Sequence, residues 1–498
     1  MRLLLGYILS ICFFHFISAQ DVGVIRQAAL EALENYDVPG FSVGIIKDGE
    51  VIMSEGYGVN MINTNVPVDG GTLYAIASNT KAFIATALAK LDKEGKLDLD
   101  DPVQKYLPYF ELYNEYVSQH TTVRDLLCHR VGLGTFSGDA IWYKSEKSPE
   151  QIIRQIKHLP AAYSWRGGYG YTNLMFITAG EVIKAVSGQT WSAYIQQHFL
   201  GPLDMSRTQT SVGTLGGLDN IATPHVTHRD NLPIDMANWD TPGAAGGILS
   251  STDDMLKWMQ VQLDPDVAEE KNIFPKAARN TCMTPHNPLN RNNFYSAGLG
   301  WFIYHREGHT VVTHGGGYDG MYSRVILVPD QKLGIVVLSN SMTSLPARLA
   351  NYIRDTYLDI DTEGWLAQAA ESEESSRKQW AEKFVKAHEH RDLDTNPTIS
   401  KSQMVGAYQD PLYGEITIDL SDDHLELHFT HAPSLSASLS HWHYDTWKLD
   451  WKEEHAWFDF GTVQFLLDNN REVKGLEFYV PNDDIFFEEI KVSKNSTD

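Results

Sequence analysis

A serine and a lysine stand three positions apart at Ser78 and Lys81. The segment from Ser78 to Leu91 is rich in Ala, Leu and Ile, which predicts a buried helix, and residues three apart share one face of a helix. A serine hydroxyl is a poor nucleophile until a neighbour accepts its proton. A lysine accepts it when burial and the positive end of the helix lower the pKa of its amine. The pair therefore predicts acyl transfer through Ser78, with Lys81 as the base.

The Ser-x-x-Lys spacing alone is weak evidence. A chain of this length and composition should contain about two such pairs by chance. Ser375 and Lys378 form another pair, in a charged and serine-rich stretch that we interpret as solvated surface. Taken by itself, Ser78 is equally compatible with a helix cap, and Lys81 with a surface residue. Other motifs must decide between the two pairs.

A Tyr-x-Asn motif at Tyr171 and Asn173 supplies a second set of polar groups. It is unique in the chain, follows the glycines Gly167, Gly168 and Gly170, and precedes an apolar helical stretch. A phenol relays a proton between nucleophile, lysine and leaving group, and an Asn amide holds a substrate carbonyl. A buried tyrosine followed by an Asn helix cap is the structural alternative.

A His-x-Gly motif at His314 and Gly316 follows a predicted short strand, residues 311–313. Small residues after the histidine let a substrate backbone approach closely. A free backbone N–H at Gly317, together with that of Ser78, would stabilise an oxyanion. A glycine-rich hairpin with an incidental histidine is the structural alternative.

The three motifs occur in the order Ser-x-x-Lys, Tyr-x-Asn and His-x-Gly. This order resembles the serine β-lactamase and penicillin-binding-protein superfamily, and in particular its class C β-lactamase-related hydrolases. The flanking sequence is similar over most of residues 24–358, in segments 97–108, 122–133, 243–255 and 314–340. The resemblance implies that Ser78 is the nucleophile and that Lys81 and Tyr171 share the base and acid roles. It assigns substrate binding to Asn173, His314, Gly316 and Gly317.

His314 departs from the β-lactamases of this superfamily, which carry the lysine of a Lys-Thr-Gly motif at this place. A lysine is a fixed cation that faces the substrate carboxylate, whereas a histidine is largely neutral at pH 7. The His-x-Gly form is more similar to D-amino-acid peptidases, amidases and some esterases of the superfamily. We therefore expect a secreted serine hydrolase of a small amide or ester, as a D-amino-acid peptidase or amidase. An esterase, a weak β-lactamase and a non-catalytic penicillin-binding or ligand-sensing protein are the alternatives.

The elements that must position these residues lie between residues 20 and 360. Predicted strands at both ends of this region, with helices between them, indicate an α+β domain built on one sheet. The resemblance implies a β-lactamase-like antiparallel sheet flanked by helices, with a helical subdomain. Before it, residues 1–19 combine Arg2, an apolar run and a small residue at Ala19. This pattern predicts an export signal and a secreted or periplasmic protein.

After residue 360 the pattern of charged and apolar residues changes. Residues 361–399 are charged with a weak helical pattern, which predicts a helical linker. Residues 400–498 contain short strand-like runs separated by turns, typical of a small antiparallel β-barrel or sandwich. The predicted strands are 414–420, 425–429, 457–460, 463–467, 476–480 and 485–488. Segments 404–408, 439–442 and 445–447 resemble a lipocalin-like domain that is attached to some of these hydrolases, which favours the barrel.

The formal net charge of −24 argues against binding to nucleic acid or to an anionic membrane, since both need a basic surface. We expect a small-molecule or short-peptide substrate, no cofactor and no membrane contact beyond export, and leave the oligomeric state open. His441 and His443 share one face of a strand, but no further ligands at catalytic spacing accompany them, so no metal site is predicted. Whether Cys128 and Cys282 pair is left open.

Overall fold

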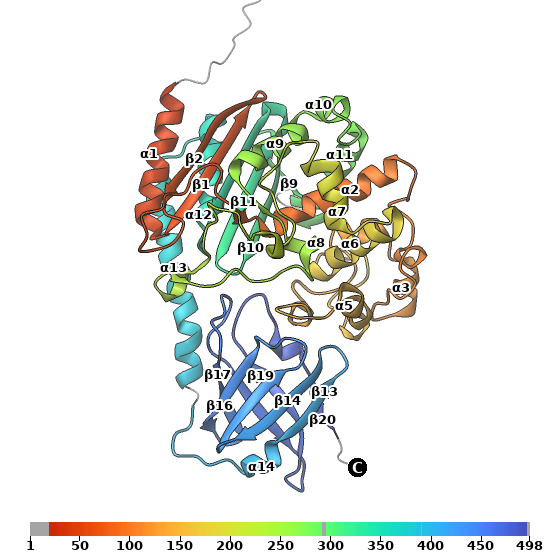
Figure 1. The fold of residues 1–498 in the computed structure, drawn as a ribbon, viewed down its shortest axis with the longest axis vertical. Helices are drawn as coiled ribbons and strands as arrows, with labels where there is room; N and C mark the ends of the chain where they lie inside the picture. The colour runs from red at the N-terminus through yellow and green to blue at the C-terminus, as the bar shows by residue number, and fades with distance from the viewer. Residues whose placement is uncertain (1–18, 291–294, 390, 496–498) are drawn as a thin grey trace, which may run out of the picture.

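The computed structural model describes residues 19–290, 295–389 and 391–495. The predicted export signal, residues 1–19, lies outside these residues except for its last position. The described chain forms an N-terminal domain and a C-terminal barrel, with one long helix running along the side of both (Figure 1). In the described part of the chain, no helix has the length and apolar composition needed to cross a membrane.

An eight-stranded sheet forms the centre of the N-terminal domain, in the order β2-β1-β12-β11-β10-β9-β8-β7. All neighbouring strands are antiparallel. Because β1 pairs with β12, the two ends of the domain's sequence meet in one sheet, and the predicted α+β class is confirmed. The strands are β1 (Gly40–Lys47), β2 (Glu50–Gly58), β7 (Asn287–Asn290), β8 (Tyr295–Ala297), β9 (Phe302–Arg306), β10 (His309–Tyr318), β11 (Met321–Val328) and β12 (Leu333–Ser339).

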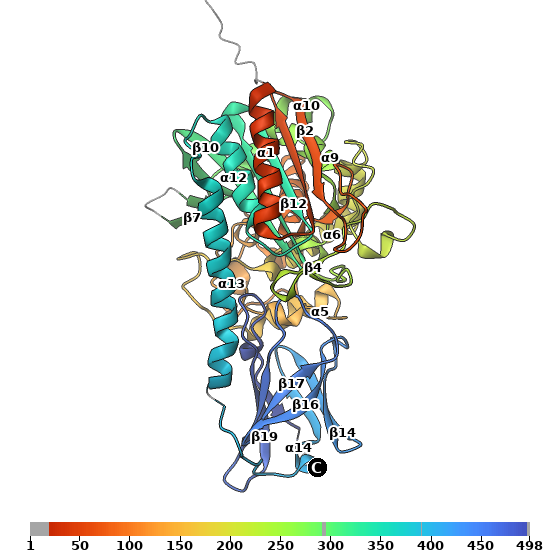
Figure 2. The same cartoon turned by 90° about the vertical axis from the view of Figure 1, so that its left-hand side faces the viewer.

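Helices cover both faces of this sheet. α1 (Ala19–Tyr36) and α12 (Leu345–Tyr357) pack on one face, which Figure 2 views directly. α9 (Thr252–Leu263) packs on the other face, and beyond it α2 (Thr80–Lys93) is almost wholly buried. The other helices of this domain are α3 (Glu115–His120), α4 (Val123–Leu127), α5 (Pro149–Gln155), α6 (Asn173–Ser187), α7 (Trp191–Ile195), α8 (Gly243–Gly246), α10 (Pro265–Glu270) and α11 (Lys276–Cys282).

Two short strand pairs complete the N-terminal domain. β3 (Tyr74–Ala75) pairs with β6 (Leu249–Ser250) just before the nucleophile segment, and β4 (His225–Val226) pairs with β5 (Leu232–Pro233). The side chain of Phe83 in α2 stacks on that of Trp258 in α9, with ring centroids 3.9 Å apart. Such fully buried aromatic pairs contribute strongly to a core, so α2 is held firmly where it carries the candidate residues.

The long connecting helix α13 (Trp365–Glu389) contains the second Ser-x-x-Lys pair. It runs beside α12 and continues down to the barrel (Figures 1 and 2). Ser375 and Lys378 are both exposed on it, and Lys378 forms an ion pair of 2.6 Å with Glu374. This environment agrees with the interpretation of the pair as solvated surface.

The C-terminal part is a closed barrel of eight antiparallel strands in sequence order, which distinguishes it from a sandwich. Pairing of the last strand with the first closes it. A short helix, α14 (Lys401–Met404), precedes the barrel. The strands are β13 (Gly406–Asp410), β14 (Gly414–Ser421), β15 (His424–Phe429), β16 (Ser436–His443), β17 (Thr446–Trp451), β18 (Thr462–Leu467), β19 (Val473–Tyr479) and β20 (Val492–Lys494).

Two of the strands predicted for this part are wrong. Residues 457–460 and 485–488 lie in the loops that connect β17 to β18 and β19 to β20. Their apolar residues are buried or half-buried without strand pairing: Trp457 and Ile485 line a cavity shared with the N-terminal domain, whereas Phe458 and Phe487 pack on each other, with ring centroids 5.1 Å apart. The prediction also missed four strands, of which β16 is rich in Ser and His and therefore lacks a clear apolar alternation.

Candidate active site

Ser78 lies in a tight turn that presents its side chain to a cavity of about 550 Å³. The turn is a short 3-10 helix, Ala77–Asn79, so α2 begins at Thr80 and not at Ser78 as predicted. The φ angle of Ala77 is +49°, a region that residues with a β-carbon rarely adopt. Two hydrogen bonds hold the turn: Asn79 Nδ2 donates to Ser323 Oγ (2.8 Å), which donates to the Ile76 carbonyl (2.8 Å).

Lys81 lies in the first turn of α2, fully buried beneath Ser78. Its Nζ is 2.9 Å from Ser78 Oγ, 2.8 Å from Asn173 Oδ1 and 2.6 Å from the carbonyl oxygen of Ala245. Burial lowers the pKa of the amine to about 7, although the nearby Asp139 opposes this shift. A large fraction of Lys81 is therefore neutral near pH 7, in hydrogen-bond contact with the candidate nucleophile.

Tyr171 immediately precedes α6 and faces the same serine. Both residues line the cavity, and burial raises the pKa of Tyr171 well above its usual value. Lys81 Nζ lies 4.9 Å from the centroid of the phenol ring, and the buried His129 stacks on that ring at 4.4 Å. The phenol is therefore neutral at physiological pH, which suits the relay of a proton better than its removal from Ser78.

Asn173, the first residue of α6, is held between Lys81 and a residue that the sequence analysis missed. Its Nδ2 donates to Asp139 Oδ2 (2.6 Å), while Trp142 Nε1 donates to Asp139 Oδ1 (2.8 Å). Asp139 is buried, and burial raises its pKa to about 8. The carboxyl fixes the Asn173 amide so that its oxygen faces Lys81. No motif marks Asp139 in the sequence, because it begins a short 3-10 helix, Asp139–Ile141, that lies 34 residues before Asn173.

His314, Gly316 and Gly317 lie on β10 where this strand has a free edge. The neighbouring β9 pairs with β10 only as far as Thr313, so the backbone beyond it borders the cavity. His314 is buried and its Nδ1 is 2.5 Å from the carbonyl oxygen of Gly315. Burial, together with the charge of Lys81, lowers the pKa of His314 to about 3. The imidazole is therefore neutral.

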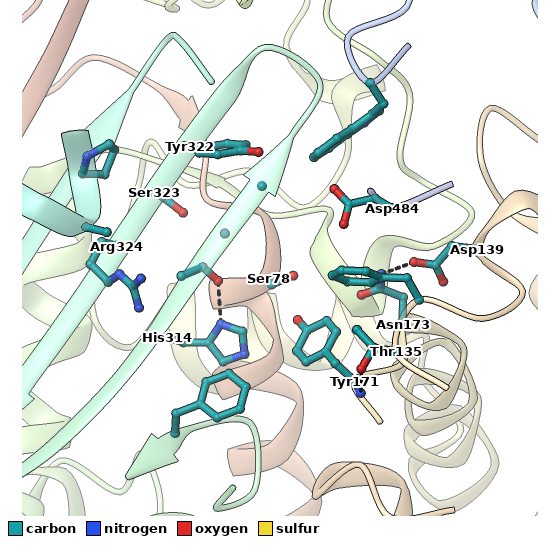
Figure 3. A pocket seen from close by; sticks show the side chains of 18 of the residues that line it. Ser78, Thr135, Asp139, Tyr171, Asn173, His314, Tyr322, Ser323, Arg324 and Asp484 are labelled. Carbon is teal, nitrogen blue, oxygen red and sulfur yellow. Dashed lines mark hydrogen bonds between the residues drawn. The ribbon is translucent and has the colours of Figure 1, made fainter. Parts of the chain in front are cut away.

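The cavity brings together Ser78, Tyr171, Asn173 and the strand segment of His314 (Figure 3), and the buried Lys81 contacts Ser78 Oγ. The two barrel loops add residues that the sequence analysis did not associate with the site. The cavity residues that concern the chemistry are Ser78, Tyr171, Asn173, His314, Gly316, Gly317, Asp139, Arg324, Trp457, Asp484 and Ile485. No sequence signal identifies the last three residues as part of the site, because the apolar residues of such loops show the same pattern in the sequence as those of a strand.

Two further expectations concern groups away from the serine. Among the described residues, no cluster of three or more His, Cys, Asp or Glu side chains is suited to hold a metal ion. Cys128 and Cys282 are both buried free thiols, and burial raises the pKa of each to about 12. Thiols with such a pKa are poor nucleophiles.

Comparison with known sequences supports the two-part organisation. A family model described as Beta-lactamase matches residues 25–358, and one described as a domain of unknown function (DUF3471) matches residues 390–494. Protein flp of Staphylococcus aureus (strain MW2) is 31% identical over 331 residues, which are 64% of this chain and 63% of that protein. The match thus spans less than two thirds of this relative.

Two solved structures are similar to this one. The octameric penicillin-binding protein homologue from Pyrococcus abyssi shares the fold over 95% of this chain and 100% of its own, with a TM-score of 0.62 and 23% identity. The D-stereospecific amidohydrolase from Streptomyces sp. covers 64% of this chain and 94% of its own, with a TM-score of 0.54 and 25% identity.

Proposed function

The chain belongs to the beta-lactamase family of hydrolases, and on this premise we propose that it cleaves a small amide or ester through an acyl-enzyme on Ser78. The set of three polar atoms around the Lys81 amine carries the proposal. A neutral amine has two hydrogens and one lone pair. With its hydrogens donated to Asn173 and Ala245, its lone pair is directed at the Ser78 hydroxyl, which is the geometry of a general base.

Acylation begins when Ser78 Oγ attacks the substrate carbonyl carbon and its proton moves to Lys81 Nζ. The carbonyl π electrons pass to the oxygen, and the backbone N–H groups of Ser78 and Gly317 are proposed to stabilise this oxyanion. When the oxyanion re-forms the carbonyl, the bond to the leaving group breaks. Tyr171 donates its hydroxyl proton to the leaving amine or alcohol and regains one from Lys81, so the base is neutral again.

Deacylation repeats these transfers with water as the nucleophile. The Lys81–Tyr171 pair accepts a proton from water as its oxygen attacks the acyl carbon. The ester bond to Ser78 Oγ then breaks, and the same pair returns a proton to the serine. Every proton is restored, and no cofactor takes part.

For the substrate we propose an amide or short peptide with a D-amino acid on the acyl side. Similarity to a D-stereospecific amidohydrolase supports this class. So does His314, because a neutral imidazole offers no cation to the carboxylate of a β-lactam. The proposal that the protein is exported is supported by the sequence pattern of residues 1–19 alone.

A fluorophosphonate probe tests the nucleophile directly. We expect intact-mass spectrometry to find one adduct per chain, with peptide mapping locating it on Ser78, because this is the serine beside a neutral amine. Ser375→Ala should label as fully as wild type, whereas Ser78→Ala should remain unlabelled. An adduct on another serine, or equal hydrolysis of nitrophenyl esters and D-aminoacyl anilides by Ser78→Ala and wild type, would contradict the proposal.

The pH dependence of kcat/KM tests the base. Lys81 accepts a proton only when neutral, and burial lowers its pKa to about 7. We therefore expect kcat/KM to rise about tenfold per pH unit up to an apparent pKa near 7, which belongs to the coupled Lys81–Tyr171 pair, and to level off above it. Burial keeps Tyr171 neutral throughout this range. A flat profile between pH 5.5 and 8.5 would rule out Lys81 as the base.

A further inference from the structure

The loop between β19 and β20 carries the barrel's polar contribution to the cavity. Asn482 shapes this loop: its Nδ2 donates to the carbonyls of Val480 (2.8 Å) and Ile485 (2.7 Å). Its Oδ1 accepts from the backbone N–H of Asp484 (3.0 Å) and of Ile485 (2.6 Å). Four hydrogen bonds to one side chain give the loop a defined conformation, and they hold the backbone of Asp484 at the cavity wall.

A second residue of the loop fastens it to the N-terminal domain. Glu489 Oε1 accepts from Ser137 Oγ (2.6 Å), and Oε2 accepts from the backbone N–H of Gly138 (2.6 Å). Hydrogen bonds to a carboxylate are among the strong ones. Ser137 and Gly138 directly precede Asp139, which holds Asn173. The loop is therefore tied to the same segment that orders the catalytic groups.

Asp484 lies within electrostatic reach of the reacting groups. Burial is the main cause of the raised pKa of Tyr171, Asp139 and Tyr322, which line the same cavity, and the charge of Asp484 adds to it in each case. Figure 3 shows its carboxylate on the Tyr171 and Asn173 side of the strand that bears His314. The sequence resemblance assigns substrate binding to Asn173, and with the acyl side of the substrate placed beside Asn173, Asp484 faces that part of it.

The Asp484 carboxylate forms no ion pair and no side-chain hydrogen bond with any of the described residues. The charge of Lys383 acts on it from a distance, but the Lys383 amine is paired with the exposed neighbour Asp483 at 2.6 Å. Arg324, the other charged group at the rim, lies across the strand of His314 and close to Gly315 (Figure 3). Burial raises the pKa of Asp484 to about 6, so it is mostly ionised at pH 7. A half-buried carboxylate without a partner favours a cation supplied by a ligand.

We infer that Asp484 binds the protonated free amine of the acyl-side residue, so that the barrel completes the substrate site and selects amides and peptides with an unblocked amino terminus. The inference rests on the proposed function for the position of the substrate. The indole of Trp457 and the phenol of Tyr322 border the same part of the cavity, and aromatic faces attract ammonium groups. The net charge of −24 attracts cationic rather than anionic substrates to the protein.

Binding measured without turnover tests this inference. In a Ser78→Ala background at pH 7, we expect calorimetry to show D-phenylalaninamide binding at least about tenfold more tightly than N-acetyl-D-phenylalaninamide, since only the former carries an ammonium. Adding Asp484→Asn should reduce this ratio to near one. Adding Asp483→Asn, on the same loop but paired with Lys383, should leave the ratio unchanged. The corresponding nitroanilides should show the same pattern in kcat/KM with Ser78 intact.

The outcomes separate the two claims. If the free amine has no advantage, or does not bind, or keeps its advantage in Asp484→Asn, the inference is overturned whether or not the protein hydrolyses anything. If the binding ratio behaves as expected but no amide or ester is cleaved, the amine subsite stands and the proposed hydrolysis fails. A loss of binding by both ligands in Asp484→Asn would indicate a structural role for the loop and would also overturn the inference.

Discussion

Replacing Lys81 with methionine is expected to lower kcat/KM by at least about 10³-fold, because the side chain that accepts the Ser78 proton is removed. The hydroxyl would be left with a phenol whose pKa is raised by burial, and a neutral phenol is a poor base. Methionine fills a similar volume, and loss of a buried amine removes the cost of desolvating a charge. The measurement is kcat/KM on an activated ester, with thermal melting of the same sample to confirm that the fold is retained.

A matched control exists on α13. Lys378 follows Ser375 at the same spacing, is exposed, and pairs only with Glu374. We expect Lys378→Met to leave kcat/KM within about twofold of wild type, since surface ion pairs contribute little. Wild-type activity in a folded Lys81→Met variant would contradict the role of Lys81 and would indicate that Tyr171 is the base. The Tyr171 phenol would then have to ionise near neutral pH in spite of its burial.

The central residues of the candidate site were predictable because the residues of each motif lie within three or four positions of one another in the sequence. Ser78 and Lys81 meet because they stand one helical turn apart, whatever surrounds them. Asp139 was not predictable in this way. It contacts Asn173 across 34 residues, and a single aspartate at the start of a short 3-10 helix has no periodicity or spacing to mark it.

The barrel illustrates a second reason why prediction from the sequence was incomplete. Alternating apolar residues revealed that the last hundred residues form short strands, and this part is confirmed as a barrel. The same alternation led to the wrong prediction of strands at residues 457–460 and 485–488. In the sequence, a buried apolar side chain of a loop cannot be distinguished from an inward-facing strand residue. The presence of Trp457 and Asp484 at the candidate site therefore follows only from the tertiary structure.

Replacing Gly316 with alanine is expected to lower kcat/KM by about 10²-fold or more. A β-carbon there would overlap the carbonyl oxygen of Ile76 and the hydroxyl of Ser323, and would lie 2.9 Å from the β-carbon of Ala77. These atoms belong to the turn that holds Ser78, and backbone cannot move aside as a side chain does. The turn must shift, and a displacement of about 1 Å costs roughly this factor in rate. Single-turnover acylation by an activated ester measures the effect at the step that it should slow.

Gly315→Ala is the matched control for the Gly316→Ala variant. Both glycines lie on β10 and neither has a positive φ, so alanine is conformationally acceptable at each. A β-carbon at Gly315 meets only the end of the Arg324 side chain, at 3.3 Å, and the end of a flexible side chain shifts more easily than backbone does. We expect Gly315→Ala to retain kcat/KM within a few-fold of wild type. An equal loss of kcat/KM in both variants would mean that β10 tolerates no side chain along the substrate edge. A loss of kcat/KM in Gly316→Ala alone would show that the contact between β10 and the Ser78 turn determines the position of the nucleophile.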